Sequence, residues 1–256
     1  MSADTSTLGL NLFGGLLFYQ VFFDLASALR WMFWGWVLQL FAVALMIAGF
    51  AVIALRLPAA ALLATFGFGT VVWLIASFVV LRGQFKCLHL EAPSQIGKIP
   101  GRRWIQVAYF CEMSSILLRV LRIWVGRGVL GLLILPLELL SLVFLLLFLR
   151  KIADVLARGD LRRWIDVVLG SIATSILCGV SFPILVQFKE QLGRPATATI
   201  GIAVIAVGGC ALIGAIAGYG IVLWRMSSAA RLFGNHLLSS YAWGEEVESE
   251  PAPADS

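Results

Sequence analysis

The strongest constraint in this sequence is a series of long apolar runs separated by short stretches that hold most of the charged residues. Of the 256 residues, 61% are apolar and 13% are charged, whereas a soluble domain is nearer half apolar and a quarter charged. A soluble fold of this length has no interior large enough to hide several apolar runs of about 20 residues. The sequence therefore predicts an all-α, polytopic membrane helical bundle.

Six runs are long enough to cross a bilayer, and the connections between them predict three helical hairpins. The predicted spans are residues 31–55, 59–81, 104–125, 129–149, 164–188 and 197–224. Trp31, Trp34 and Trp36 open the first span, which predicts an aromatic belt at the level of the lipid head groups.

The two ends of the chain differ from these runs. Residues 1–30 combine a polar start with an apolar stretch that Asn11, Gln20 and Asp24 interrupt. We expect an amphipathic helix lying in the membrane interface and leading into the first span; a seventh span is the alternative. Residues 225–256 form a predicted cytoplasmic tail that is acidic and disordered from about residue 244.

The orientation follows from the basic residues. With six spans, thirteen of the nineteen Lys and Arg residues fall on the side that holds both termini. This asymmetry places both termini in the cytoplasm, where basic loops also meet anionic lipid head groups. The lipid bilayer is therefore the predicted partner. Nucleic acid is not, because membrane spans interrupt the basic residues, and the sequence identifies no protein partner.

Glu138 is the most informative polar position, since it lies about 14 Å into the fourth span. An isolated carboxylate at such depth costs about 2.5–3.5 kcal/mol, so it must face protein or water, or be protonated. We expect a structural ion pair with Arg119 or Arg122 of the preceding span. The alternative is a proton or ion site beside Pro136. Glu112, seven residues before Arg119, belongs to the same face of the third span.

Small residues in the sixth span point to close helix packing. Gly214 and Gly218 form a G-x-x-x-G motif, which lets two helix backbones approach closely. Packing inside the bundle is the favoured interpretation, with dimerisation as the alternative.

No catalytic, cofactor or metal motif stands out. Cys87, His89 and Glu91 alternate in one loop, but typical zinc sites use paired Cys or His ligands at other spacings. We therefore predict a chain without cofactor or metal and without enzymatic activity.

Three stretches resemble a group of uncharacterised multipass membrane proteins of planctomycete-type bacteria. They are residues 29–53, the segment KCLHLEAPSQIGKIPGRRWI and the segment LLFLRKIADVLARGDLRRW. Cys87 and Pro93 fit the pattern of that group, whereas Gly101 and Arg102 lack the Ala that separates them there. The resemblance covers about residues 29–165. It implies a bacterial inner-membrane protein with the same spans over that region and no known activity.

Two functions therefore compete. The first is a non-enzymatic integral membrane protein with a structural or interaction role. The second is a small transporter or channel-like protein that uses Glu138, Arg119 and Glu112.

Overall fold

Six helices make up the part of the chain that the computed structural model describes, namely residues 5–55, 58–90, 101–125, 130–187 and 194–248. In chain order the helices are α1 (Thr5–Ala54), α2 (Ala59–Leu88), α3 (Arg102–Val125), α4 (Leu130–Val155), α5 (Gly159–Gln187) and α7 (Arg194–Glu248). Each helix is long and apolar enough to cross a membrane. The predicted all-α, six-helix bundle is confirmed.

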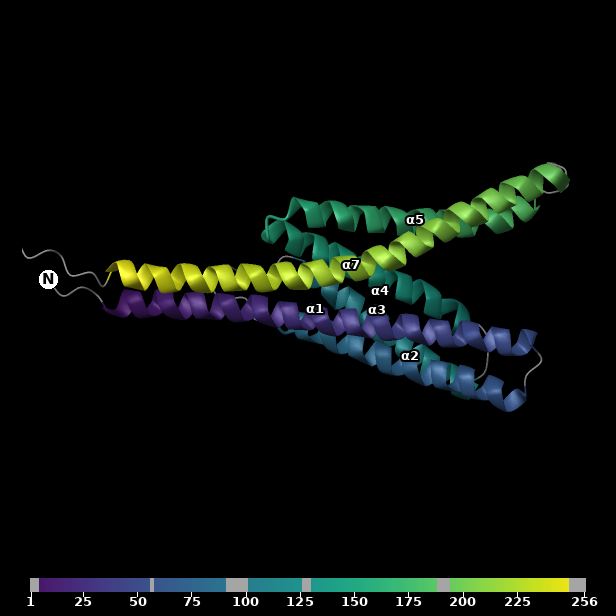
Figure 1. The fold of residues 1–256 in the computed structure, drawn as a ribbon, viewed down its shortest axis with the longest axis horizontal. Coiled ribbons are helices and arrows are strands. Elements are labelled where there is room, and N and C mark those ends of the chain that lie inside the picture. The colour runs from purple at the N-terminus through teal and green to yellow at the C-terminus, as the bar shows by residue number, and fades with distance from the viewer. Residues whose placement is uncertain (1–4, 56–57, 91–100, 126–129, 188–193, 249–256) are drawn as a thin grey trace, which may run out of the picture.

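The helices pair as three hairpins. α1 packs along α2, α3 along α4, and α5 along α7, as the sequence predicts. α7 also packs along α1, so the first and last helices close the arrangement (Figure 1). α2 also contacts α3, and α4 contacts α5, but each of these contacts covers a shorter stretch of helix.

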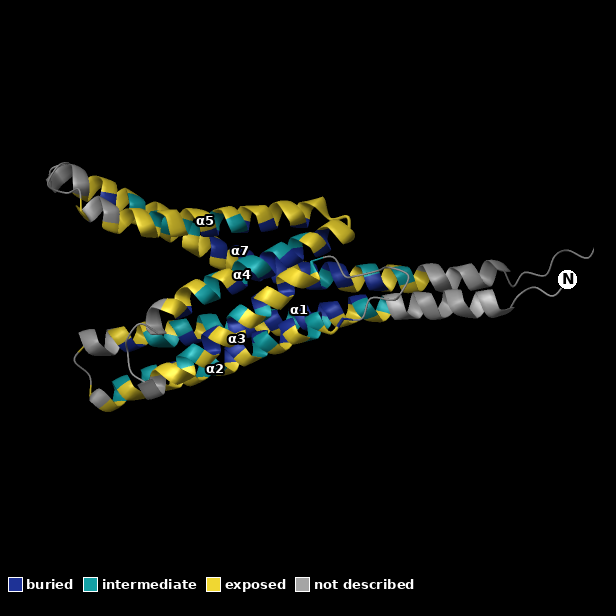
Figure 2. Ribbon diagram, turned by 180° about the vertical axis from the view of Figure 1, so that it is seen from behind, coloured by how far each residue is buried: buried dark blue, intermediate teal, exposed yellow. Residues whose placement is uncertain are grey.

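The buried core lies where all six helices meet, toward the side on which α1 begins and α7 ends. Its largest fully buried side chains include Met32 of α1, Ile105 of α3, Phe148 of α4, Ile165 of α5 and Met226 of α7. Away from this region the helices separate and expose large apolar side chains over most of their surface (Figure 2). Such a surface suits lipid, because lipid chains cover apolar side chains that water would not.

α1 runs without interruption from Thr5 to Ala54, so the amino-terminal segment and the first predicted span form one continuous helix. Its packing against α7 explains the continuity. Phe22 contacts the ring of Phe233 at 4.8 Å between centroids, and the Ser227 hydroxyl donates to the Ala26 carbonyl at 3.0 Å. Residues 8–29 therefore add no seventh helix.

Several helices extend beyond the predicted spans. α2 continues to Leu88, and only residues 156–158 separate α4 from α5. α7 continues to Glu248, so the prediction of disorder is wrong for residues 244–248; residues 249–256 lie outside the described residues. At 1.5 Å per residue, α1 is about 75 Å long and α7 about 82 Å. A hydrocarbon core of about 30 Å therefore accommodates less than half of either helix.

The tryptophans at the predicted span ends divide into exposed and half-buried positions. Trp31 and Trp34 are exposed, as are Trp104, Trp164 and Trp224 on α3, α5 and α7. Trp36 is half-buried, and its ring packs against that of Tyr219 on α7.

Candidate intramembrane polar site

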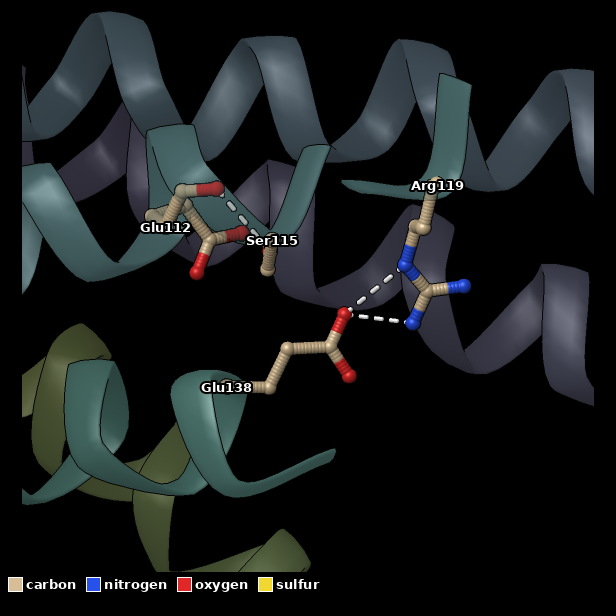
Figure 3. Close-up of polar contacts among 4 residues, drawn as sticks. All are labelled: Glu112, Ser115, Arg119 and Glu138. Atoms are coloured by element: carbon tan, nitrogen blue, oxygen red, sulfur yellow. Dashed lines mark hydrogen bonds and ion pairs between the residues drawn. The ribbon is translucent and has the colours of Figure 1, made fainter. Parts of the chain in front are cut away.

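The central contact of the candidate site joins α3 to α4. Nε of Arg119 donates a hydrogen bond to Oε1 of Glu138 at 3.0 Å, and Nη2 contacts the same oxygen (Figure 3). The two side chains remain 30% and 23% exposed, so the pair sits at the edge of the hairpin rather than in the core. Of the two arginines that the sequence offers as partners, Arg119 is the one that binds.

A third helix completes the surroundings of Arg119. The guanidinium carbon lies 5.0 Å from the ring centroid of Trp73 on α2, within the range of a cation–π interaction. Nothing in the sequence near Trp73 indicated this contact, because α2 and α3 are joined through a long polar loop. Arg119 of α3 therefore contacts both α2 and α4.

Glu138 itself lies within a continuous helix. Pro136 is inside α4, and the helix extends from Leu130 to Val155 around it. A proline lacks the N–H that would bond to the carbonyl four residues earlier. α4 nevertheless continues past Pro136 and Glu138 without a break.

Glu112 occupies a different environment from Glu138. It lies on α3 two turns from Arg119, on the side that faces α4 (Figure 3), and its side chain is buried. No ion pair reaches it within the part of the chain that the structure describes. Its carboxyl group lies near the Ser141 hydroxyl of α4 and within electrostatic range of Glu138 and Arg119.

Two buried serines of the hairpin donate hydrogen bonds to backbone carbonyls of α3. The Ser115 hydroxyl donates to the carbonyl oxygen of Glu112 at 2.9 Å, and that of Ser141 donates to the carbonyl oxygen of Ala108 at 3.0 Å. Both serines are buried. The sequence around Ser141 does not mark it as a site residue, since a serine in a span commonly bonds back to its own helix. Here it bridges two helices.

Arg122 lies apart from this cluster. Its side chain is exposed in the last turn of α3, and no ion pair of the described residues includes it. The structure therefore brings Arg119, Glu138 and Glu112 to one face of the α3–α4 hairpin and leaves Arg122 outside it.

The G-x-x-x-G motif faces α5 of the same chain. A Cβ atom added at Gly218 would lie 2.6 Å from Cγ2 of Val168, and one added at Gly214 would lie 3.9 Å from the Ser171 hydroxyl. Gly208 continues this contact, with Cβ of Cys178 at 2.8 Å from its added Cβ. These distances place the motif in the packing of α7 on α5.

Chemically, the site combines one ion pair, several hydroxyls and one buried carboxyl that has no ion pair among the described residues. No group of three His, Cys, Asp or Glu side chains suited to a metal occurs among the residues that the structure describes. Cys87 is buried and His89 exposed, whereas Glu91 lies outside the described residues. No protein-family model matches the chain, and neither the curated proteins nor the solved structures contain a significant match.

Proposed function

We propose that this chain is a non-enzymatic, multi-pass membrane protein with a structural or interaction role, in which Arg119 and Glu138 lock the third and fourth helices together. The observation that carries this proposal is the ion pair itself, with Trp73 over the guanidinium. A carboxylate that already holds a cation of the same protein is not free to bind a transported ion. Paired intramembrane charges of this kind stabilise helix association.

The proposed orientation and lipid contacts come from charge. The chain lies in a bacterial inner membrane with both termini in the cytoplasm, where its basic residues meet anionic head groups. The side-by-side packing of the start of α1 and the end of α7 supports placing both termini on one side. The resemblance to planctomycete-type membrane proteins over residues 29–165 is part of the same proposal.

A second candidate function rests on Glu112. This buried carboxyl has no ion-pair partner among the described residues and lies near the middle of α3. Lone intramembrane carboxyls occur in proton relays of pumps and transporters. A proton-coupled transporter would use Glu112 as the group that gains and loses the proton.

Charge substitutions in the ion pair test the first candidate. Arg119→Gln and Glu138→Gln each leave one uncompensated charge, and we expect both to lower resistance to unfolding in mixed micelles. The exchanged variant Arg119→Glu/Glu138→Arg keeps both charges and is expected to recover part of the loss. Wild-type resistance to unfolding in both single variants would refute the proposed role of this ion pair in holding α3 and α4 together.

A flux measurement separates the second candidate from the first. Full-length protein is reconstituted into vesicles that enclose a pH-sensitive dye, and a pH gradient is applied. The structural proposal predicts the same proton leak as in protein-free vesicles. A leak that wild-type protein produces and Glu112→Gln abolishes, with the folded state intact, would favour the transporter.

A further inference from the structure

Two cations of α2 face α1 at the level of the exposed tryptophans. Arg82 and Lys86 are one turn apart on α2, opposite Trp31 and Ser27 on the antiparallel α1. The Arg82 guanidinium carbon lies 4.7 Å from the Trp31 ring centroid, and Nζ of Lys86 donates to the Ser27 hydroxyl at 3.3 Å. The four side chains therefore form one continuous patch across the groove between the two helices.

Within the residues that the structure describes, no ion pair neutralises the charge of this patch. Neither Arg82 nor Lys86 takes part in any ion pair of the described residues. The acidic group that follows on this face of α1 is Asp24, one turn beyond Ser27, and His89 lies at the corresponding level of α2. Asp24 likewise makes no ion pair in the described part of the chain.

Three of the five basic residues around the α4–α5 connection show the opposite arrangement. Their acidic partners lie within 3.0 to 3.1 Å in the pairs Arg150–Asp166, Arg158–Asp160 and Arg162–Asp154. The two regions thus differ, since three arginines near the α4–α5 connection each pair with an aspartate, whereas neither Arg82 nor Lys86 has an ion pair among the described residues.

We propose that Arg82, Lys86, Ser27 and Trp31 form a binding site for the phosphate group of an anionic phospholipid. The donors suit this ligand: Trp31 holds the guanidinium from one face and leaves its N–H edge free, and Lys86 has two further N–H donors. Trp31 is itself exposed, as is Trp34 one turn further along α1, where an indole ring lies at the head-group level. The site rests on the proposed membrane orientation but is independent of the Arg119–Glu138 lock.

The binding test uses the full chain in a neutral detergent and three probes. These are dioctanoyl phosphatidylglycerol, zwitterionic dioctanoyl phosphatidylcholine and inorganic phosphate, each titrated while the melting temperature is recorded. We expect the phosphatidylglycerol to raise the melting temperature saturably, and the phosphatidylcholine and inorganic phosphate to have little effect. Saturable binding of inorganic phosphate with equal affinity would assign the site to free phosphate and overturn the lipid as its ligand.

Two double variants with the same change in charge localise the effect. Arg82→Gln/Lys86→Gln removes the proposed donors and should weaken phosphatidylglycerol binding by about tenfold or more. Arg158→Gln/Arg162→Gln removes two neutralised cations from the same side, so we expect a change within about twofold. An equal loss in both variants would mean diffuse surface attraction and would overturn this site while leaving the membrane orientation intact.

Further variants keep the test decisive if the first double variant folds poorly. Arg82→Lys retains the charge but removes the planar fork, so it should fold normally and bind the anionic lipid more weakly than the wild type. Trp31→Phe should weaken binding in the same direction. Wild-type affinity in both variants would overturn the proposed site.

Discussion

Single residues in the polar site differ in what their removal leaves behind. Glu138→Gln strands the Arg119 guanidinium, and an uncompensated charge at this depth costs about 2.5–3.5 kcal/mol. Glu112→Gln strands no cation, because no ion pair reaches Glu112 among the described residues. We therefore expect Glu112→Gln to lower the free energy of unfolding by less than about 1 kcal/mol. Unfolding by sodium dodecyl sulfate in mixed micelles measures both changes, and equal losses would contradict the assignment.

The sequence predicted part of this site and missed part of it for a geometric reason. Depth and hairpin connectivity placed Glu138 opposite two arginines of the preceding span. They could not choose between Arg119 and Arg122, because residues three apart lie on nearly the same face of a helix and differ in depth by only about 4.5 Å. Trp73 and Ser141 were missed since contacts with other helices depend on how each helix is rotated. Hydropathy carries little information on that rotation.

Helix elements approach each other most closely at certain glycines. In the α1–α2 hairpin, a Cβ atom at Gly35 would lie 2.9 Å from the backbone N of Val80 and 3.0 Å from the carbonyl O of Ala76. Gly67 has no atom within 4 Å of its added Cβ. We expect Gly35→Ala to destabilise the protein by about 1–3 kcal/mol. The control Gly67→Ala should stabilise it by roughly 0.5–1 kcal/mol. Thermal unfolding in detergent compares the two, and a neutral Gly35→Ala would show that the helices separate easily.

The contact of α7 with α5 leads to a related prediction. A larger side chain at Gly218 collides with Val168 of the same chain, so Gly218→Val should lower the melting temperature at every protein concentration. The matched control is Gly209→Val, because the space around Gly209 is open. A loss confined to a concentration-dependent dimer would instead indicate that the motif joins two copies.

At the level of the helices, the sequence predicted all six elements but not their full lengths. Apolar runs reveal where a helix crosses lipid, and the six runs correspond to the six helices. The ends of the helices depend on packing as well. α1 is continuous on its amino-terminal side because Phe22 and Ala26 contact α7, and α7 continues past Trp224 for the same reason. A contact between residues about 200 positions apart leaves no local signal in the sequence.

Across the whole molecule, six spans require both termini to lie on one side of the membrane. A green fluorescent protein fused after Ser256, or before Met1, should be fluorescent in cells, and alkaline phosphatase at either place should be inactive. The control is a fusion between residues 126 and 129, at the opposite end of α3, where phosphatase should be active. An active phosphatase after Ser256 would contradict the proposed orientation.

The pairing of the first and last helices has a consequence for how the protein is made. The Ser227 hydroxyl bonds to the Ala26 carbonyl across 201 positions of the chain. At roughly 5–20 residues per second, a ribosome needs about 10–40 s to synthesise the segment between them. Throughout that interval Phe22 and Leu25, both buried in the finished protein, have no partner from α7. The amino-terminal part of α1 is therefore an apolar segment that the insertion machinery or the membrane surface must shelter until translation is almost complete.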